Sequence, residues 1–239
     1  MNEQPAPASR RRPTHRKGRP TLTREAVGRA ALDFLGRRGA AELTMRSLAA
    51  ELGVSPRAVY NYVEDRRDLV ALAAEIFASE WRPPPLDPAR WRDCLRAYCD
   101  DLRAHYRRHP GMTTLALREN VTMARHPTML RNVDALIGFF AAVGLPLPDA
   151  YRACMETIRA VVGFVEFQDA PYDRPPAHLD PDDLERTPPS WLRPDGGLDL
   201  PYLRRCADEL EPDDNDARFA FTVEVLVEGI AARPALTAR

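Results

Sequence analysis

Four side chains that could hydrogen-bond to nucleic acid lie within six positions of the chain: Arg57, Tyr60, Asn61 and Tyr62. An arginine can donate two hydrogen bonds to guanine, and an asparagine can pair with the edge of adenine. Tyrosine hydroxyls commonly reach phosphate oxygens. The stretch directly follows Ser55-Pro56, a helix N-cap with proline at the first helical position. These types and spacings indicate a short helix that contacts double-stranded DNA.

The short helix is preceded by a tight turn and another short helix. Residues 48–63 read LAAELGVSPRAVYNYV, in which a helical run is interrupted at Gly53. Glycine can adopt the positive φ that such a turn needs. Ala49 is small enough to let the second helix approach, and three valines can pack back onto the first helix: Val54, Val59 and Val63. The pattern predicts a helix-turn-helix whose second helix enters a major groove.

A longer helix is expected before the helix-turn-helix. Apolar residues recur there at the spacing of one helix face: Val27, Ala31, Phe34 and Leu35. Gly39 is a stop signal for this helix, and Thr44 can cap the next one. We therefore expect a three-helix DNA-binding domain over residues 21–66.

A fourth helix is expected to connect this domain to the rest of the chain. Asp65 can cap it, and its apolar residues repeat at intervals of three and four. It should end near Trp81, because the prolines at 83–85 cannot continue a helix. The expected connecting helix covers residues 67–82.

The remaining residues, 83–239, also show helical periodicity and should form a second, larger domain. Six helices are expected in it, at 91–109, 113–123, 128–143, 149–167, 199–209 and 213–233. The acidic, proline-rich range 170–197 is expected to be a long loop that covers a pocket, reaches across a dimer or is disordered. We find no strand pattern and no internal repeat, so the predicted fold class is all-α.

Charge is distributed unevenly along the 239 residues. The first 82 residues hold 15 Lys and Arg against 10 Asp and Glu, whereas the remainder holds 19 against 25. A basic N-terminal part on an acidic body suggests an anionic partner for the first part only. Residues 1–20 are proline-rich and basic and should form a disordered arm. We expect this arm to follow the minor groove, with a role in solubility as the alternative.

Neither a membrane segment nor a secretion signal is expected. No apolar run approaches the ~20 residues of a membrane span. The basic N-terminus is not followed by the apolar stretch of a signal peptide. Hydrophobic residues make up 44% of the chain, enough for a sizeable core. The expectation is a cytoplasmic protein without a membrane partner.

No catalytic or metal-binding motif is found. The sequence lacks a glycine-rich phosphate loop, GxSxG and HExxH. His105 and His109 are spaced i, i+4 and could share a metal ion, but they lack the intervening glutamate and a third ligand. The cysteines show no CxxC spacing, so buried reduced thiols are favoured over metal or disulfide roles: Cys94, Cys99, Cys154 and Cys206. We expect no enzyme activity, no metal site and no cofactor.

Residues 23–77 resemble the DNA-binding domain of the TetR family of transcriptional regulators. The resemblance is carried above all by ELTMRSLAAELGVSPRAVYNYVEDRRDLVALAAEIF at 42–77. Its elements are Leu43-Thr44-Met45-Arg46, Leu48-Ala49, Gly53-Val54-Ser55, then Tyr60, Tyr62 and Val63, and a fourth helix that begins with arginines. No single element is decisive, whereas their joint spacing over about 55 residues is highly specific.

The pattern and the resemblance together imply a set of DNA-contacting residues. Those at the start of the second helix would contact backbone and an adjacent base, those of the recognition helix would face base edges or phosphates, and the arginine that opens the fourth helix would meet phosphate. The set is Thr44, Arg46, Ser55, Pro56, Arg57, Ala58, Tyr60, Asn61, Tyr62 and Arg66. The alternatives are a core role for Tyr60, a solvated charge for Arg57, and pairing of Arg46 with Glu42 or Glu51.

The C-terminal part more loosely resembles the regulatory domain of the tetracycline-repressor branch of the family, through YRRHPGMTTLALREN (106–120) and ARFAFTVEVLVEGIAA (217–232). Two helices from each subunit form the dimer interface in those proteins, and the helices expected at 149–167 and 213–233 would do so here. The implied interface residues are Met155, Ile158, Val162, Val165, Phe219, Val223, Leu226 and Ile230. The last helix is apolar on a second face too, at Phe221, Val225 and Val227.

The same resemblance implies a pocket for an unidentified small-molecule effector inside the helical bundle. Its candidate lining residues are His105, Met112, Leu115, Asn120, Phe139, Met155, Arg159 and Phe164. The alternative is that Met and Phe at helical spacing are simply core residues.

The leading interpretation is a homodimeric repressor that leaves a palindromic operator when the effector binds. The alternatives are a ligand-independent regulator or an activator and, less favoured, a helical interaction protein without specific DNA binding.

Overall fold

The computed structural model of the chain describes residues 15–16, 19–20, 22–122, 126–175, 199–210, 214–233 and 236. Within these ranges the protein is helical, apart from two strands of two residues each, β1 (His15–Arg16) and β2 (Arg19–Pro20), which pair antiparallel. The all-α prediction is therefore confirmed. Most of the predicted arm at 1–20 and most of the predicted loop at 170–197 lie outside the described residues.

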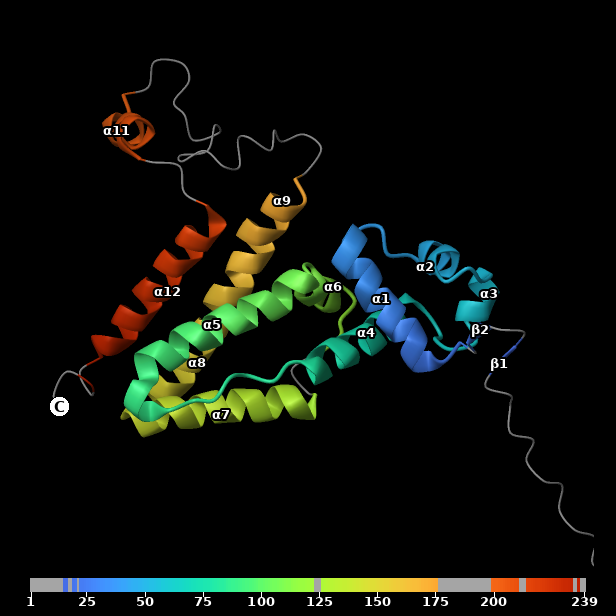
Figure 1. Cartoon of the computed structure of the whole chain (residues 1–239), viewed down its shortest axis with the longest axis horizontal. Helices are drawn as coiled ribbons and strands as arrows, with labels where there is room; N and C mark the ends of the chain where they lie inside the picture. The colour runs from blue at the N-terminus through green and yellow to red at the C-terminus, as the bar shows by residue number, and fades with distance from the viewer. Residues whose placement is uncertain are drawn as a thin grey trace, which may run out of the picture.

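Four helices form the N-terminal domain at one end of the molecule (Figure 1): α1 (Arg24–Arg38), α2 (Met45–Glu51), α3 (Pro56–Val59) and α4 (Arg66–Glu80). Each begins at a side chain that accepts a hydrogen bond of 2.8 to 3.3 Å from the backbone N–H three residues later: Thr23, Thr44, Ser55 and Asp65. Gly39 ends α1 with a φ of +80°. The predicted caps at Thr44, Ser55 and Asp65 and the stop at Gly39 are confirmed.

The C-terminal domain contains a short 3₁₀ helix η1 (Pro88–Arg90) and helices α5 (Trp91–Arg108), α6 (Met112–Arg118), α7 (Pro127–Val143), α8 (Leu147–Phe164), α9 (Ala170–Asp173), α11 (Pro201–Glu209) and α12 (Asn215–Ala231). The prediction of a helix at 113–123 was wrong at its end. This helix stops at Arg118, because Asn120 adopts a φ of +54° and leaves the right-handed helical region.

Between α8 and α9 lies a π-helical turn, η3 (Val165–Asp169), so that residues 147–173 form one continuous helical rod. We call this element the long rod. The predicted loop at 170–197 was wrong at its start, because residues 170–173 continue the rod. Single π-turns inside α-helices are rare and often occur at functional sites. The rod ends beside the C-terminal end of α1 (Figure 1).

One apolar core runs through both domains. In the N-terminal domain α1 packs on α4, and in the C-terminal domain α8 packs on α7 and α5 while α12 packs on α5 and α8. Large side chains that are almost fully buried hold these contacts, among them Phe34, Phe77, Tyr98, Phe140 and Phe219. Each is worth about 1.5–3 kcal/mol of burial. No helix in the described ranges is long and apolar enough to cross a lipid bilayer.

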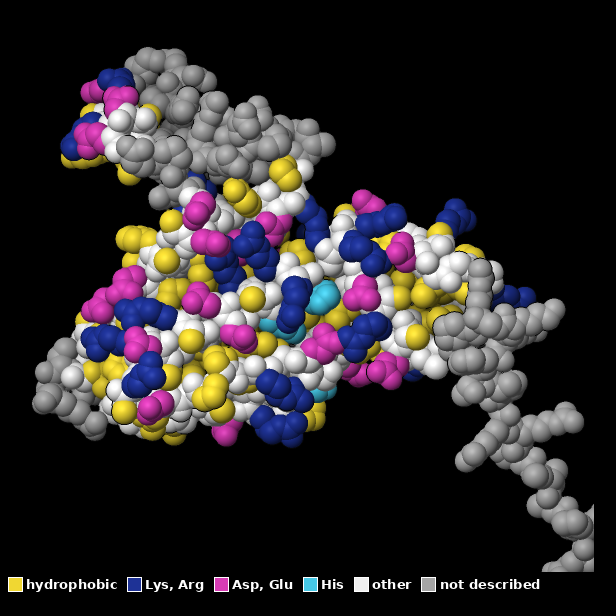
Figure 2. Space-filling view, in the orientation of Figure 1, with side chains coloured by type: hydrophobic (Ala, Val, Ile, Leu, Met, Phe, Trp, Pro, Cys, Tyr) yellow, Lys and Arg dark blue, Asp and Glu magenta, His cyan; other side chains and the backbone are white. Residues whose placement is uncertain are grey.

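The two domains touch through backbone as well as side chains. Gly36 of α1 faces the end of α5, where a Cβ added to the glycine would lie 2.7 Å from the carbonyl oxygen of Arg108. Histidine side chains lie at this junction, and Figure 2 shows them on the surface between the two domains. At Gly36 the two helices therefore approach each other directly, with no side chain of α1 between them.

Candidate nucleic-acid interface and regulatory surfaces

The turn of the helix-turn-helix is fixed by its backbone and by small apolar side chains. Gly53 has a φ of +64°, and the N–H of Val54 donates to the Ala49 carbonyl at 3.0 Å. Ala49 and Val59 are completely buried, and Val63 is 2% exposed. The recognition helix α3 is thereby held on α2, and the predicted packing of the two helices is confirmed.

The outward face of this unit carries most of the predicted DNA-contacting side chains. Thr44, Arg46, Ser55, Pro56, Arg57, Tyr60 and Asn61 are exposed, whereas Ala58 and Tyr62 are half-buried. Tyr62 packs partly against the core. The exposed residues lie on consecutive short elements, at the N-termini of α2 and α3 and just after α3. This arrangement offers hydrogen-bond donors and acceptors on one protruding surface, as groove reading requires.

The structure removes the alternatives for two of these residues, Tyr60 and Arg46. Tyr60 is 51% exposed and is therefore not a core residue. Glu51 pairs with Arg37, with Nη2 2.6 Å from Oε1, and not with Arg46. Among the residues that the structure describes, neither Arg46 nor Arg57 forms an ion pair. Both guanidinium groups are thus available to an external acceptor.

Arg66 is placed differently from the other predicted contact residues. It is half-buried, its Nε lies 2.6 Å from Oε1 of Glu119, and it also donates to the Leu43 carbonyl. Its guanidinium joins the start of α4 to the end of α6. The neighbouring Arg67 is exposed and donates to the Asn120 carbonyl at 3.4 Å. A phosphate contact by Arg66 stays a prediction, and sequence reasoning missed its partner Glu119, 53 positions away.

A bidentate ion pair between α1 and α4 holds the helix-turn-helix in place. Arg24 at the start of α1 donates from Nη1 and Nη2 to Asp68 of α4, at 3.0 and 2.6 Å. The hydrogen bond from Arg24 lowers the pKa of the Asp68 carboxyl. Arg24 also donates to the Tyr62 carbonyl. The segment that follows α3 is therefore tied to both long helices of the domain.

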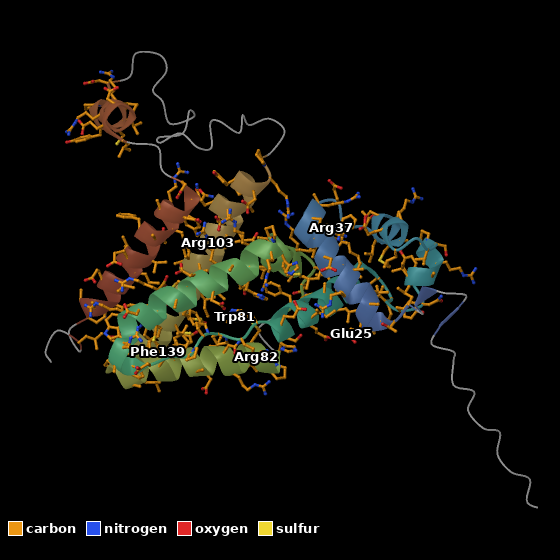
Figure 3. The ribbon with its side chains drawn as sticks, in the orientation of Figure 1. Glu25, Arg37, Trp81, Arg82, Arg103 and Phe139 are labelled. Atoms are coloured by element: carbon orange, nitrogen blue, oxygen red, sulfur yellow. The ribbon has the colours of Figure 1, made fainter. Side chains whose placement is uncertain are left out.

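The predicted effector residues do not converge on one cavity. Met112, Leu115 and Phe139 are buried in the core, and Figure 3 labels Phe139 on α7. Met155 and Phe164 are half-buried against it. Asn120 is exposed and lines a surface pocket of about 440 Å³ between α4 and the start of α7. Arg159 is exposed and paired with Glu156. The assignment as a set stays a prediction.

His105 lies in an aromatic cluster at the centre of the chain. It is 2% exposed, and its ring centroid lies 4.2 Å from that of Phe77 and 6.1 Å from that of Trp81. Burial, together with the nearby charge of Arg108, lowers the pKa of His105 to about 4. The imidazole is therefore neutral at pH 7. Sequence reasoning did not place Phe77 and Trp81, from α4, around a histidine of α5.

An apolar groove of about 450 Å³ lies between α8 and α12. Leu145, Ala153, Ala160, Val225, Leu226, Gly229 and Ile230 contribute its apolar lining. One rim is charged: Asp149 accepts from Arg152 at 2.8 Å and from Arg233 at 3.1 Å. These hydrogen bonds lower the pKa of the Asp149 carboxyl. An open apolar groove with a charged rim has the composition of an interaction surface.

The predicted dimer residues split into two groups. Val165, Phe219, Val223 and Ile230 are at most 5% exposed and pack inside this chain, whereas Met155, Ile158, Val162 and Leu226 are half-buried. Large apolar side chains that these helices leave outside include Phe221 at 72%, Val225 at 58% and Tyr151 at 54% exposure. The exposure of Phe221 and Val225 could have been inferred from the sequence, because the last helix has a second apolar face.

A buried ion cluster joins α5 to the long rod and to α12. Arg103 donates to both oxygens of Asp169, at 2.8 and 2.7 Å, and to Asp216 at 2.9 Å. Asp169 is fully buried. The guanidinium also lies over the rings of Phe164 and Phe219, at 5.2 and 4.5 Å. Arg103 extends from α5 toward these elements in Figure 3. Sequence reasoning missed this cluster, whose members are 66 and 113 positions apart.

No group of three or more His, Cys, Asp or Glu side chains that could hold a metal ion occurs in the described part of the chain. His109 is engaged elsewhere, with its Nδ1 3.1 Å from the Leu32 carbonyl oxygen. The four cysteines are free thiols, and Cys99 and Cys154 are buried. Burial raises the pKa of each of these two thiols to about 12. Both are therefore unreactive at pH 7.

Comparison with known proteins gives matches over both domains. Residues 84–233 match the model of the tetracyclin repressor-like C-terminal domain, and residues 29–73 match that of bacterial regulatory proteins of the tetR family. The class A tetracycline repressor protein of Escherichia coli, from transposon 1721, is 30% identical over 226 residues, which cover 89% of this chain and 92% of that repressor.

Two further proteins extend this comparison. The HTH-type transcriptional repressor DrrR1 of Streptomyces coeruleorubidus is 29% identical over 159 residues, which cover 66% of this chain and only 57% of DrrR1. The crystal structure of a possible TetR family transcriptional regulator from Streptomyces coelicolor A3(2) superimposes with a TM-score of 0.67 and 26% identity, covering 87% of this chain and 98% of that one. These similar proteins are regulators and not enzymes. With the helix-turn-helix described above, the matches show that the chain belongs to the TetR family of transcriptional regulators.

Proposed function

We propose that the protein is a homodimeric transcriptional repressor that binds a palindromic operator and leaves it when a small molecule binds the C-terminal domain. The observation that carries the proposal is the rigid helix-turn-helix with Arg57, Tyr60 and Asn61 exposed on it. In this proposal residues 21–66 form the DNA-binding domain, 67–82 the connecting helix and 83–239 the regulatory domain. A DNA-binding regulator of a bacterial family works in the cytoplasm, where the chromosome is.

The exposed side chains divide into base-reading and phosphate-binding groups. Arg57 and Asn61 have the donors and acceptors that discriminate guanine and adenine in the major groove. Thr44, Arg46 and Tyr60 are exposed beside them and suit phosphate oxygens. Arg67 is exposed at the start of α4, and we assign to it the phosphate contact expected of Arg66, whose guanidinium is held by Glu119.

A second copy of the chain is the occupant that we propose for the groove between α8 and α12. Phe221, Val225 and Tyr151 are large apolar side chains left exposed on these helices. Their burial against the same face of another copy gives an isologous, two-fold interface. A four-residue recognition helix reads few base pairs alone, and a two-fold dimer doubles the site into a palindrome.

The effector proposal rests on the likeness of residues 84–233 to the tetracyclin repressor-like C-terminal domain. The tetracycline repressors are named after tetracycline. For this chain we propose only the class of ligand, a small organic molecule. Binding shifts the dimer toward a spacing of recognition helices that does not fit the operator.

The experiment is selection of duplexes from a random DNA library with the full-length protein at fixed salt. We expect an inverted repeat, bound by a dimer. The double variant Arg57→Ala, Tyr60→Ala should lose about 10–100-fold or more in affinity for that repeat, because it removes a base contact worth about 1–3 kcal/mol together with a phosphate contact. Arg90→Ala, an exposed change on η1, should bind as the parent does.

Three results would contradict the proposal. Recovery of no motif would leave only nonspecific binding through phosphates. Recovery of a motif without two-fold symmetry would remove the palindrome. An unchanged affinity of the double variant would mean that another surface reads the DNA.

A further inference from the structure

The C-terminal end of α1 receives hydrogen bonds from the regulatory domain. Arg174, the residue that follows α9, donates from its guanidinium to the carbonyls of Leu35, at 3.3 Å, and Gly36. These carbonyls belong to the last turn of α1, where intrahelical donors run out, although the Leu35 carbonyl also accepts from the Gly39 N–H at 2.9 Å. A cation is also favoured at a helix C-terminus by the helix dipole. Arg174 therefore caps a helix of the DNA-binding domain from 138 residues away.

The position of Arg174 is set by ion pairs on the residues before it. Arg107 of α5 donates to both oxygens of Asp173, at 2.7 and 2.6 Å. One helical turn earlier, the buried Asp169 is held by Arg103 in the same two-pronged way. Arg103 also binds Asp216 at the start of α12. The end of the long rod is thus pinned to α5 and α12, which leaves little freedom for the residue that caps α1.

The π-turn of the rod makes a second contact that leads to the DNA-binding domain. Glu166 accepts from the N–H of Gly111 at 3.0 Å and from the Thr114 hydroxyl at 3.3 Å. These groups lie at the N-terminus of α6, which no side chain of its own caps. The other end of α6 holds α4 through the pair between Glu119 and Arg66. One rod therefore reaches α1 directly and α4 through α6.

We propose that the long rod sets the orientation of the DNA-binding domain, with Arg174 as the positioning residue. The rod lines the groove between α8 and α12 at one end and caps α1 at the other. Helices bend most readily at π-turns and at proline, and the rod contains both, at Val165–Asp169 and at Pro171. The ion pairs of Asp169 and Asp173 brace this part of the rod against α5, so that the rod moves as a body. A shift of α8 against α12 is thereby carried to α1. This inference rests on the proposed function, since its consequence is the fit of the recognition helix to DNA.

The test compares full-length Arg174→Ala with the parent by hydrogen exchange of the backbone amides and by affinity for the selected operator. Loss of the cap should speed exchange in the segment 33–42 several-fold. Loss of a fixed orientation should weaken operator binding by about 5-fold or more. Arg174→Lys, which keeps the charge and one donor group, should restore part of both. Arg90→Ala is the matched control, since it removes an exposed arginine far from α1.

A second variant separates the rod from a merely local cap. Arg107 does not contact α1, yet it holds Asp173. Arg107→Ala should therefore change exchange at 33–42 in the same direction, and its effect should not add to that of Arg174→Ala. Asp173→Asn, which keeps the shape of the side chain, should act like Arg107→Ala if the latter variant proves unstable.

The possible outcomes keep the two proposals apart. If the parent binds no specific duplex, the proposed function fails whatever Arg174 does. If the parent binds its operator and Arg174→Ala changes neither exchange nor affinity, the inference alone fails. If Arg174→Ala changes both while Arg107→Ala and Asp173→Asn change neither, the cap is local and the role of the rod is overturned.

Discussion

The two domains secure their polar groups by different means. Each helix from α1 to α4 begins at a side chain that caps its own backbone three residues later. In the C-terminal domain α7 and α12 begin at a side-chain cap, whereas α5, α6 and α8 do not. Distant partners stabilise these elements instead, such as Asp169 for Arg103 and Glu166 for the start of α6. Local caps thus begin every helix of the DNA-binding part, whereas several helices of the regulatory part depend on long-range contacts at these positions.

The largest effect on stability should come from removing the buried carboxylate of the regulatory part, because its long-range contact replaces a local one. Asp169→Ala leaves Arg103 buried without its main partner, because Asp216 is largely exposed to solvent. We expect the free energy of unfolding to fall by about 3–5 kcal/mol. Urea denaturation measures the change. Asp216→Ala is the matched control on the same arginine and should lose much less, and equal losses for the two variants would show that burial is not the cause.

A smaller effect should appear when the pH is lowered. The pKa of His105 is about 4 in the folded protein and about 6.5 in the unfolded chain, so the unfolded state binds more protons between these values. The free energy of unfolding should therefore decrease as the pH is lowered, by about 2 kcal/mol from pH 7 to pH 5. His105→Phe keeps a ring in the cluster and should flatten the profile. Parallel profiles for parent and variant would assign the pH dependence to other groups.

The smallest effect should come from a single local cap. Ser55 accepts from the N–H of Ala58 at 3.3 Å and is the only side-chain cap of the short helix α3 within the described residues. Ser55→Ala should lower the free energy of unfolding by about 1 kcal/mol. Ser79→Ala removes a hydroxyl that donates to the Ile76 carbonyl within α4, and this control should cost less. An equal or larger loss in the control would remove the cap as the explanation.

The same difference explains how much could be predicted from sequence. The caps at Thr44, Ser55 and Asp65 and the turn at Gly53 each depend on a few adjacent residues, so the starts of these helices in the DNA-binding domain were predicted correctly. Helix periodicity also gave the helices of the second domain, although their ends were less accurate. The end of α6 depends on Asn120, which adopts a left-handed backbone conformation. Asparagine tolerates this conformation, but its presence in a sequence does not predict it.

The contacts between domains could not be predicted from spacing. The sequence around Arg66 does not indicate that Glu119 is its partner. The sequence around Arg174 likewise does not indicate a hydrogen bond to the carbonyls of α1. Such pairs depend on how helices cross, which periodicity does not specify. The outer face of α12 is an intermediate case. A helix apolar on two faces predicted an interface, but only the fold shows that Phe219 points inward and Phe221 outward.

Gly36 has a consequence for how stiff the protein is as a whole. A glycine inside a helix costs about 1 kcal/mol relative to alanine, and here it brings the α1 backbone against the end of α5. Side chains at a joint can change rotamer and absorb a displacement, whereas two backbones in contact cannot. The contact between the two domains is therefore stiff at Gly36. A displacement of the end of α5 would therefore press on the α1 backbone at Gly36 with no α1 side chain between them.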